Sequence, residues 1–162
     1  MKIIKKPVLL AALLLLPGES RAASIGAVGL SFLGDSPGGT EQWVLKPADL
    51  AGVAPQANWN NIDCLVTNIP PYTGISVPLV NHAGNLTAMQ LQFIADDAWS
   101  ANGSTATPNE KLMKGLLKQS LSGSMTLIFT NVPMDSYEVY VYGDVDSGPQ
   151  SLDVSIGSTT AH

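Results

Sequence analysis

The sequence predicts an all-β protein, an antiparallel β-sandwich or jelly roll with one short accessory helix. Two observations predict this fold class. Most apolar residues recur with a period of two, which is the pattern of half-buried strands. Glycine, asparagine, proline, aspartate or serine occupies nearly every gap between these segments. Short strands separated by such turns are typical of antiparallel sandwiches and jelly rolls.

The first 22 residues have the pattern of a secretory signal peptide. Three lysines within the first six residues precede an apolar run over residues 8–16, and a small-residue exit closes the segment at Ala22. This run is too short to span a bilayer, which needs roughly 20 apolar residues. We therefore expect residues 1–22 to be removed and residues 23–162 to form one domain. That domain is expected to be secreted or held at a cell surface, with no membrane span after cleavage.

The alternating segments follow one another along residues 23–162. A turn over residues 157–160 leads towards a further strand that the sequence does not show, so we expect a fragment of a longer protein, incomplete at its C-terminus. Tyr140 and Tyr142 fall on the opposite face of their strand, where we expect a second sheet or a loop to cover them. The alternating residues are Val28, Leu30 and Phe32; Thr87, Met89, Leu91 and Phe93; Met125, Leu127 and Phe129; Tyr137, Val139 and Val141; and Leu152, Val154 and Ile156.

One segment departs from the strand pattern. Thr107, Pro108 and Glu110 combine a capping threonine, a proline at the first helical position and a glutamate three residues after the cap. Leucines and a methionine then recur at helical spacing. The pattern predicts a helix over residues 108–118 that covers an open end or one face of the sandwich. A groove for a partner is the alternative interpretation of its apolar side.

Composition restricts the function of residues 23–162. The leader holds four of the eight basic residues and one of the thirteen acidic residues, which leaves four against twelve and a formal net charge of −8. Nucleic acids and anionic membranes require a cationic surface, so neither is an expected partner. Cys64 is the sole cysteine and is expected to be a small buried residue. With two histidines, a zinc site or a Ser-His-Asp triad is not expected, and we predict no cofactor.

Several stretches resemble a known group of exported proteins. Residues 49–61 read DLAGVAPQANWNN, residues 85–88 read NLTA and residues 111–115 read KLMKG. Residues 131–133 and 137–142 continue the pattern. The chain resembles exported domains of bacteria of the planctomycete and verrucomicrobial type, which often carry a PEP-type C-terminal sorting signal. The resemblance implies a galactose-binding-like β-sandwich whose ligand is undefined, but the closing strands and the C-terminal anchor of that group are not recognisable here.

The most specific run of that resemblance supplies the candidate binding site: Asn58, Trp59, Asn60 and Asn61. In the first interpretation, Trp59 stacks on the apolar face of a sugar ring while the asparagine amides bond its hydroxyls. In the second, the asparagines shape a loop through Asx-turns and Trp59 fixes that loop to the core. Further aromatic candidates for a stacking surface are Trp43, Tyr72 and Trp99.

Two other features indicate chemistry more weakly. Asp144 and Asp146 are a calcium candidate, but the segment lacks the further carboxylates of an EF-hand loop, and a solvated hairpin loop is the alternative. Asp96 and Asp97 are a candidate acid and base pair. We expect a non-catalytic extracellular module that binds a polysaccharide or a cell-surface glycan. The alternatives are a structural or adhesive surface module that makes protein contacts, and a polysaccharide hydrolase that uses the adjacent aspartates.

Overall fold

A computed structural model of the chain describes backbone and side chains for residues 26–35, 42–64, 78–118, 125–133 and 137–143. It describes the backbone alone for residues 9–10, 12–17, 72–74, 154–156 and 159–161. Most regular structure in these residues is β-strand, with one short helix, so the all-β fold class is confirmed. The calcium candidates Asp144 and Asp146 lie outside the described residues.

The first sheet contains four strands in the order β10-β2-β3-β4. They are β2 (Ala12–Pro17), β3 (Val28–Phe32), β4 (Asn60–Ile62) and β10 (Tyr137–Tyr142). β2 pairs antiparallel with both β10 and β3, whereas β3 and β4 are parallel. All five residues of β3 are buried, so this strand is covered on both faces.

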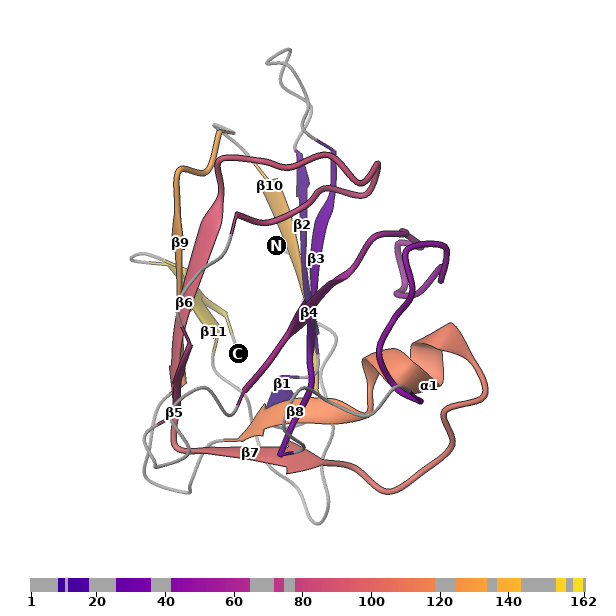
Figure 1. The fold of residues 1–162 in the computed structure, drawn as a ribbon. Helices are drawn as coiled ribbons and strands as arrows, with labels where there is room; N and C mark the ends of the chain where they lie inside the picture. Colours follow the sequence, from indigo (N-terminus) through magenta and orange to yellow (C-terminus); the bar gives the residue numbers. More distant parts are fainter. Residues whose placement is uncertain are drawn as a thin grey trace.

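The second sheet contains the antiparallel strands β5 (Tyr72–Gly74), β6 (Gln90–Ala95) and β9 (Thr126–Thr130), in the order β5-β6-β9. Exposed and buried residues alternate along β6, as the period of two predicts. The second sheet stands opposite the first (Figure 1), and apolar side chains of both meet in one core. The main members of that core are Val28, Leu30, Phe32, Leu91, Phe93, Ala95, Val139 and Val141.

A third sheet of β1 (Leu9–Leu10), β8 (Gly115–Lys118) and β7 (Asp97–Ser100) crosses between the two, at the bottom of Figure 1. The helix prediction over residues 108–118 is wrong in its second half. Helix α1 ends at Leu112, and residues 115–118 form β8 instead. The reason lies partly in Gly115, where a Cβ would stand 2.1 Å from the carbonyl oxygen of Phe32. β8 therefore lies in close contact with the end of β3.

A hairpin of β11 (Val154–Ile156) and β12 (Thr159–Ala161) lies near the end of the chain. The expectation that the turn after residue 156 leads to no strand was wrong, because β12 follows and pairs antiparallel with β11. The tripeptide Thr159–Ala161 is too short for periodicity to identify it in the sequence.

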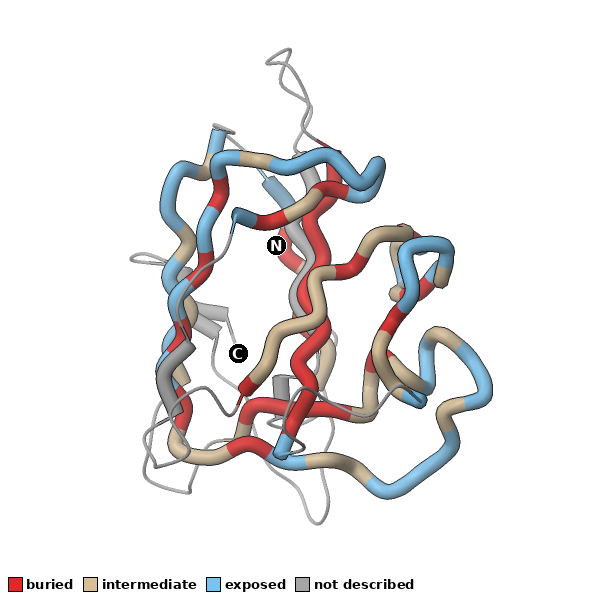
Figure 2. The backbone as a smooth tube through the Cα atoms, in the orientation of Figure 1, coloured by how far each residue is buried: buried red, intermediate tan, exposed pale blue. Residues whose placement is uncertain are grey.

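A second apolar cluster lies outside the first sheet. Tyr140 and Tyr142 of β10 face it, as their alternation with buried valines predicts, and a loop rather than a sheet covers them. This loop, residues 42–59, and helix α1 lie beside each other on the right of Figure 2, with buried positions where they approach the sheet. No helix within the described ranges is long and apolar enough to cross a membrane.

Candidate functional site

Trp59 is the centre of the predicted ligand group, and its ring is buried. Its exposed fraction is 4%, and its indole N–H donates to the carbonyl oxygen of Gln56 over 3.0 Å. The ring also makes an edge-on contact with Tyr142, with the ring centroids 6.4 Å apart. A sugar ring needs an open aromatic face, so Trp59 offers none in this arrangement. The structure agrees with the second interpretation, in which Trp59 fixes the loop to the core.

Asn60 and Asn61 hold neighbouring segments together through their amide groups. The side chain of Asn60 donates to the carbonyl oxygens of Gly29 and Val80, and it accepts from the Val80 N–H over 2.8 Å. The side chain of Asn61 exchanges two hydrogen bonds with the backbone of Leu45. Both amides bond backbone groups of neighbouring segments in the way that a paired strand would. They are therefore already engaged in hydrogen bonds within the protein.

Asn58 stands at a turn. Its φ of 54° lies in the left-handed region, which asparagine tolerates better than most residues. Its side-chain amide donates to the backbone carbonyl of His82, and the His82 Nδ1 atom accepts from the Ala27 N–H. Asn58 therefore lies on the same loop as Trp59, but its amide contacts the loop around residue 82. The four predicted residues are adjacent in sequence yet form a structural junction.

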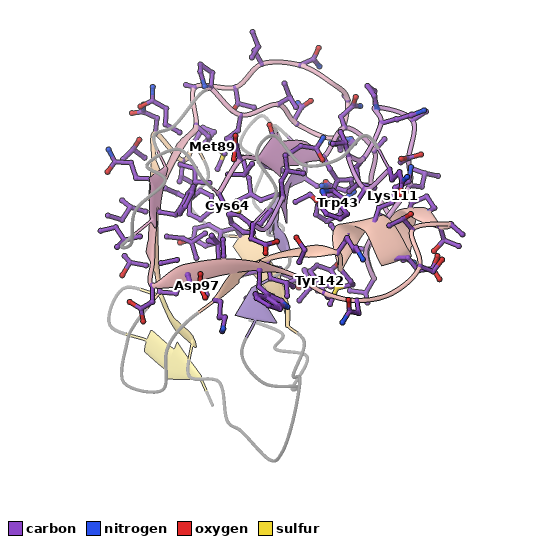
Figure 3. The ribbon with its side chains drawn as sticks, turned by 60° about the horizontal axis from the view of Figure 1, so that its bottom comes forward. Trp43, Cys64, Met89, Asp97, Lys111 and Tyr142 are labelled. Atoms are coloured by element: carbon purple, nitrogen blue, oxygen red, sulfur yellow. The ribbon has the colours of Figure 1, made fainter. Side chains whose placement is uncertain are left out.

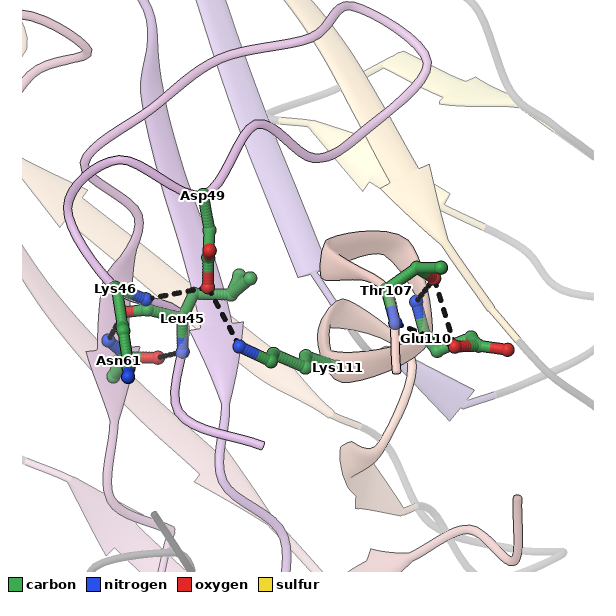
Figure 4. Close-up of polar contacts among 7 residues, drawn as sticks. All are labelled: Leu45, Lys46, Asp49, Asn61, Thr107, Glu110 and Lys111. Atoms are coloured by element: carbon green, nitrogen blue, oxygen red, sulfur yellow. Dashed lines mark hydrogen bonds and ion pairs between the residues drawn. The ribbon is translucent and has the colours of Figure 1, made fainter. Parts of the chain in front are cut away.

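The loop that carries these residues is fastened to helix α1 (Figure 4). Asp49 accepts from the Lys46 N–H and forms a 3.0 Å ion pair with Lys111. The hydrogen bond from the Lys46 backbone, followed by the Lys111 ammonium, lowers the pKa of Asp49. A second fastening is the 2.8 Å hydrogen bond from the Gly52 N–H to the side chain of Asn109.

A different aromatic group is open to solvent. Trp99 on β7 is 42% exposed, and the Lys118 ammonium lies 5.2 Å from the centroid of its ring. Asp97, two residues earlier on the same face of β7, accepts from Lys118 over 3.4 Å. The strand register aligns Asp97 with Lys118 across β7 and β8. We call Asp97, Trp99 and Lys118 the Trp99 group; Figure 3 labels Asp97 beside β7.

The sequence named Trp99 and Asp97 separately but did not join them to Lys118. The period-two spacing of Asp97 and Trp99 was visible in the sequence. The predicted helix over residues 108–118 included Lys118, so the sequence did not indicate that this lysine would pair with Asp97 across β7 and β8. Ser100 falls on the opposite face of β7 from Trp99, and its Oγ donates to a carboxylate oxygen of Asp35. The group thus presents an open ring, a carboxylate and an ammonium within one surface.

Trp43 does not join that surface in the described structure. Trp43 is only partly exposed, the Lys114 ammonium lies 5.5 Å from its ring centroid, and its indole nitrogen is buried and has no hydrogen-bond partner among the described residues. Figure 3 labels Trp43 on the same side of the molecule as helix α1. For Tyr72 only the backbone, in β5, is described. The described candidates Trp43 and Trp99 therefore lie against different lysines, Lys114 and Lys118.

Among the acidic candidates, Asp97 is engaged in an ion pair. One carboxylate oxygen of Asp97 forms an ion pair with Lys118, and the other accepts from the Ala98 N–H over 2.9 Å. Within the part of the chain that the structure describes, no group of three or more histidine, cysteine, aspartate or glutamate side chains is arranged to hold a metal ion. Cys64 is fully buried, as predicted, and burial raises the pKa of its thiol to about 12.

Comparison of the chain with protein-family models, with curated proteins and with solved structures gives no match.

Proposed function

We propose that the chain is a non-catalytic extracellular module with a galactose-binding-like β-sandwich fold, and that it binds carbohydrate through the Trp99 group. The export signal over residues 1–22 and the resemblance in residues 49–61 support an extracellular location. Two sheets that share one apolar core support the sandwich architecture.

The single observation that carries the carbohydrate proposal is the half-open ring of Trp99 beside two charged groups. An indole presents a large flat apolar surface, which suits the C–H face of a pyranose ring. Asp97 accepts hydrogen bonds and Lys118 donates them, so a sugar's hydroxyls find both kinds of partner within reach of the ring. The ammonium also favours an acidic sugar, since a uronate carboxylate would compete with Asp97 for it.

The test is binding of the purified chain to arrayed and insoluble polysaccharides. We expect saturable binding to one glycan class, and at least tenfold weaker binding for Trp99→Ala with an unchanged unfolding midpoint. Leu86→Ala is the matched control, because Leu86 is 74% exposed and lies on a loop away from β7. Equal binding by wild type and Trp99→Ala, or no binding to any glycan, contradicts the proposal.

The adhesive alternative is favoured by one further observation, the outer face of β6 and β9. This face carries no charged side chain in these two strands, and its two isoleucines are 44% and 43% exposed. An uncharged flat face of this kind suits contact with another protein. Its side chains are Gln90, Gln92, Ile94, Thr126, Ile128 and Thr130.

Sedimentation velocity separates the two functions. If this face makes protein contacts, the chain self-associates as its concentration rises, and Ile128→Lys returns it to a monomer. Ile128→Lys leaves glycan binding unchanged if the Trp99 group is the binding site, because the two surfaces belong to different sheets.

A further inference from the structure

Strand β2 occupies the middle of the first sheet. Its six residues pair with all six residues of β10, from Tyr137 opposite Pro17 to Tyr142 opposite Ala12. On its other side, four of them pair with β3, from Ala12 opposite Ser31 to Leu15 opposite Val28. Figure 1 shows β2 between these two strands. Within the described residues, β2 is the sole sheet neighbour of β10.

This strand lies entirely inside the segment predicted to be a cleaved leader. Removal of residues 1–22 therefore takes away the central strand of the sheet and leaves the position between β3 and β10 open. The backbone N–H and C=O groups that β3 and β10 direct at β2 then lose their partners. Buried backbone groups without partners are costly, so the open position favours a replacement strand.

The surroundings define what the replacement must be. On one face of the position, Val28 and Leu30 of β3 and Val139 and Val141 of β10 belong to the main core. On the other face, Tyr140 and Tyr142 belong to the second apolar cluster together with Trp59. A strand covered on both faces is apolar at every position rather than at alternate ones. The unbroken apolar run at residues 12–16 has this composition.

We propose that the position between β3 and β10 is a strand-accepting site, which binds an extended apolar segment of another polypeptide once residues 1–22 are removed. Such a segment would run antiparallel to both neighbours and be uncharged over about six residues. A second copy of the chain is a poorer donor, because the longest uninterrupted apolar run in residues 23–162 is Val139–Tyr142, which already forms β10. The proposal rests on the leader prediction and is independent of glycan binding.

The experiment starts from the folded full chain with a protease site inserted between Pro17 and Gly26. Cleavage after folding leaves the N-terminal fragment held by non-covalent contacts alone, which include the pairing of β2 with β3 and β10 and of β1 with β8. A fluorescent peptide of residues 5–18, which retains Lys5 and Lys6 for solubility, is then added as the probe. The control peptide carries Leu14→Pro, since Leu14 pairs with Gly29 and Tyr140 and proline removes the backbone N–H.

We expect the labelled peptide to replace the fragment in a saturable manner, and the control peptide to bind at least tenfold more weakly. Two results overturn the proposal: equal uptake of both peptides, which indicates non-specific adhesion, and loss of the fragment without any change in the unfolding midpoint, which indicates that β10 closes directly onto β3. Mass spectrometry of the exported chain supplies a further test. An exported protein that retains residues 9–17 keeps β2 permanently and also overturns the proposal.

Discussion

At the scale of single residues, the loop asparagines and Trp59 form a junction between backbone segments. Gly29 is part of that junction, because a Cβ there would stand 1.7 Å from the Gln56 amide nitrogen and 2.6 Å from the Trp59 ring. Glycine at this position lets the loop lie directly on β3. The buried Gln56 side chain fills the space, although neither of its polar atoms has a hydrogen-bond partner among the described residues.

The first prediction concerns Trp59. We expect Trp59→Ala to lower the free energy of unfolding by about 3–5 kcal/mol, because it removes a buried ring. Trp59→Phe keeps most of the ring but removes one of the two donors to the Gln56 carbonyl oxygen, which still accepts from the Ala51 N–H, so a loss of about 0.5–1.5 kcal/mol is expected. Urea unfolding followed by circular dichroism measures both. A variant Trp59→Ala as stable as the wild type would contradict the structural role.

The second prediction concerns Cys64. Its thiol ordinarily ionises near pH 9.0, and burial raises its pKa to about 12 in the folded chain. The unfolded state therefore loses this proton first, so the contribution to stability is complete below pH 9 and falls between pH 9 and pH 12. The expected slope is up to about 1.4 kcal/mol per pH unit.

The control for this prediction is Cys64→Ala, which lacks the thiol but keeps every other group that titrates in alkali, including Tyr142, whose pKa burial also raises. Denaturant unfolding of both proteins from pH 8 to pH 11 isolates the contribution of the thiol. Parallel pH curves for the two proteins would show that Cys64 is not buried as described.

At the scale of elements, helix α1 and strand β8 show which features the sequence predicts and which it does not. Thr107 and Glu110 form the expected capping box, with Thr107 Oγ1 accepting from the Glu110 N–H and the Glu110 carboxylate accepting from the Thr107 N–H. The start of the helix is local chemistry and was predictable. Its end depends on the approach of Gly115 to β3, a contact far away in sequence that no local pattern contains.

In the candidate site as well, local features were predictable and contacts between residues distant in sequence were not. Trp99 and Asp97 were recognisable as candidates because aromatic and acidic residues are visible in the sequence. Their neighbour Lys118 was not, since it reaches them through the pairing of β7 with β8. Trp59 was a candidate for stacking on a sugar, but whether an aromatic ring is buried or open depends on packing that sequence spacing does not record.

The third prediction concerns the fastening of loop 42–59 to helix α1. The pKa of Asp49 is lowered by the Lys46 N–H and by Lys111, so Asp49 stabilises the fold above its ordinary pKa of 3.8 and ceases to do so as the pH falls through its lower folded value. We expect Asp49→Asn to lower the free energy of unfolding by roughly 1 kcal/mol at pH 7. The difference from wild type should shrink below pH 4. Chemical denaturation at pH 7 and pH 3 tests both statements, and a difference of constant size would refute the electrostatic explanation.

At the scale of the whole molecule, the two main sheets meet in a single core. Phe32 of β3 and Phe93 of β6 make an edge-to-face contact, with their ring centroids 6.0 Å apart. This contact joins the sheets directly, so it reports whether they face each other in solution as the proposed sandwich requires.

The fourth prediction is a coupling energy between these two rings. In a double-mutant cycle of Phe32→Leu and Phe93→Leu, we expect the two losses of stability to be non-additive by about 0.5–1.5 kcal/mol. The control is a second double-mutant cycle of Phe32→Leu and Ile128→Ala. Because Ile128 is 43% exposed, the two losses of stability should add in this cycle. If the losses of stability add in both cycles, Phe32 and Phe93 do not contact each other in solution and the sheets do not face each other as described.

The three tryptophans of the chain lie in three different settings: Trp59 inside the loop junction, Trp43 beneath Lys114 and Trp99 open to water beneath Lys118. Each of these three settings therefore contains one intrinsic fluorophore. Acrylamide should quench Trp99 most readily and Trp59 least, and a ligand at β7 should shield the first without altering the second. Acrylamide quenching of the unlabelled protein thus distinguishes occupancy of the surface, which reduces the readily quenched emission, from loosening of the interior, which increases it.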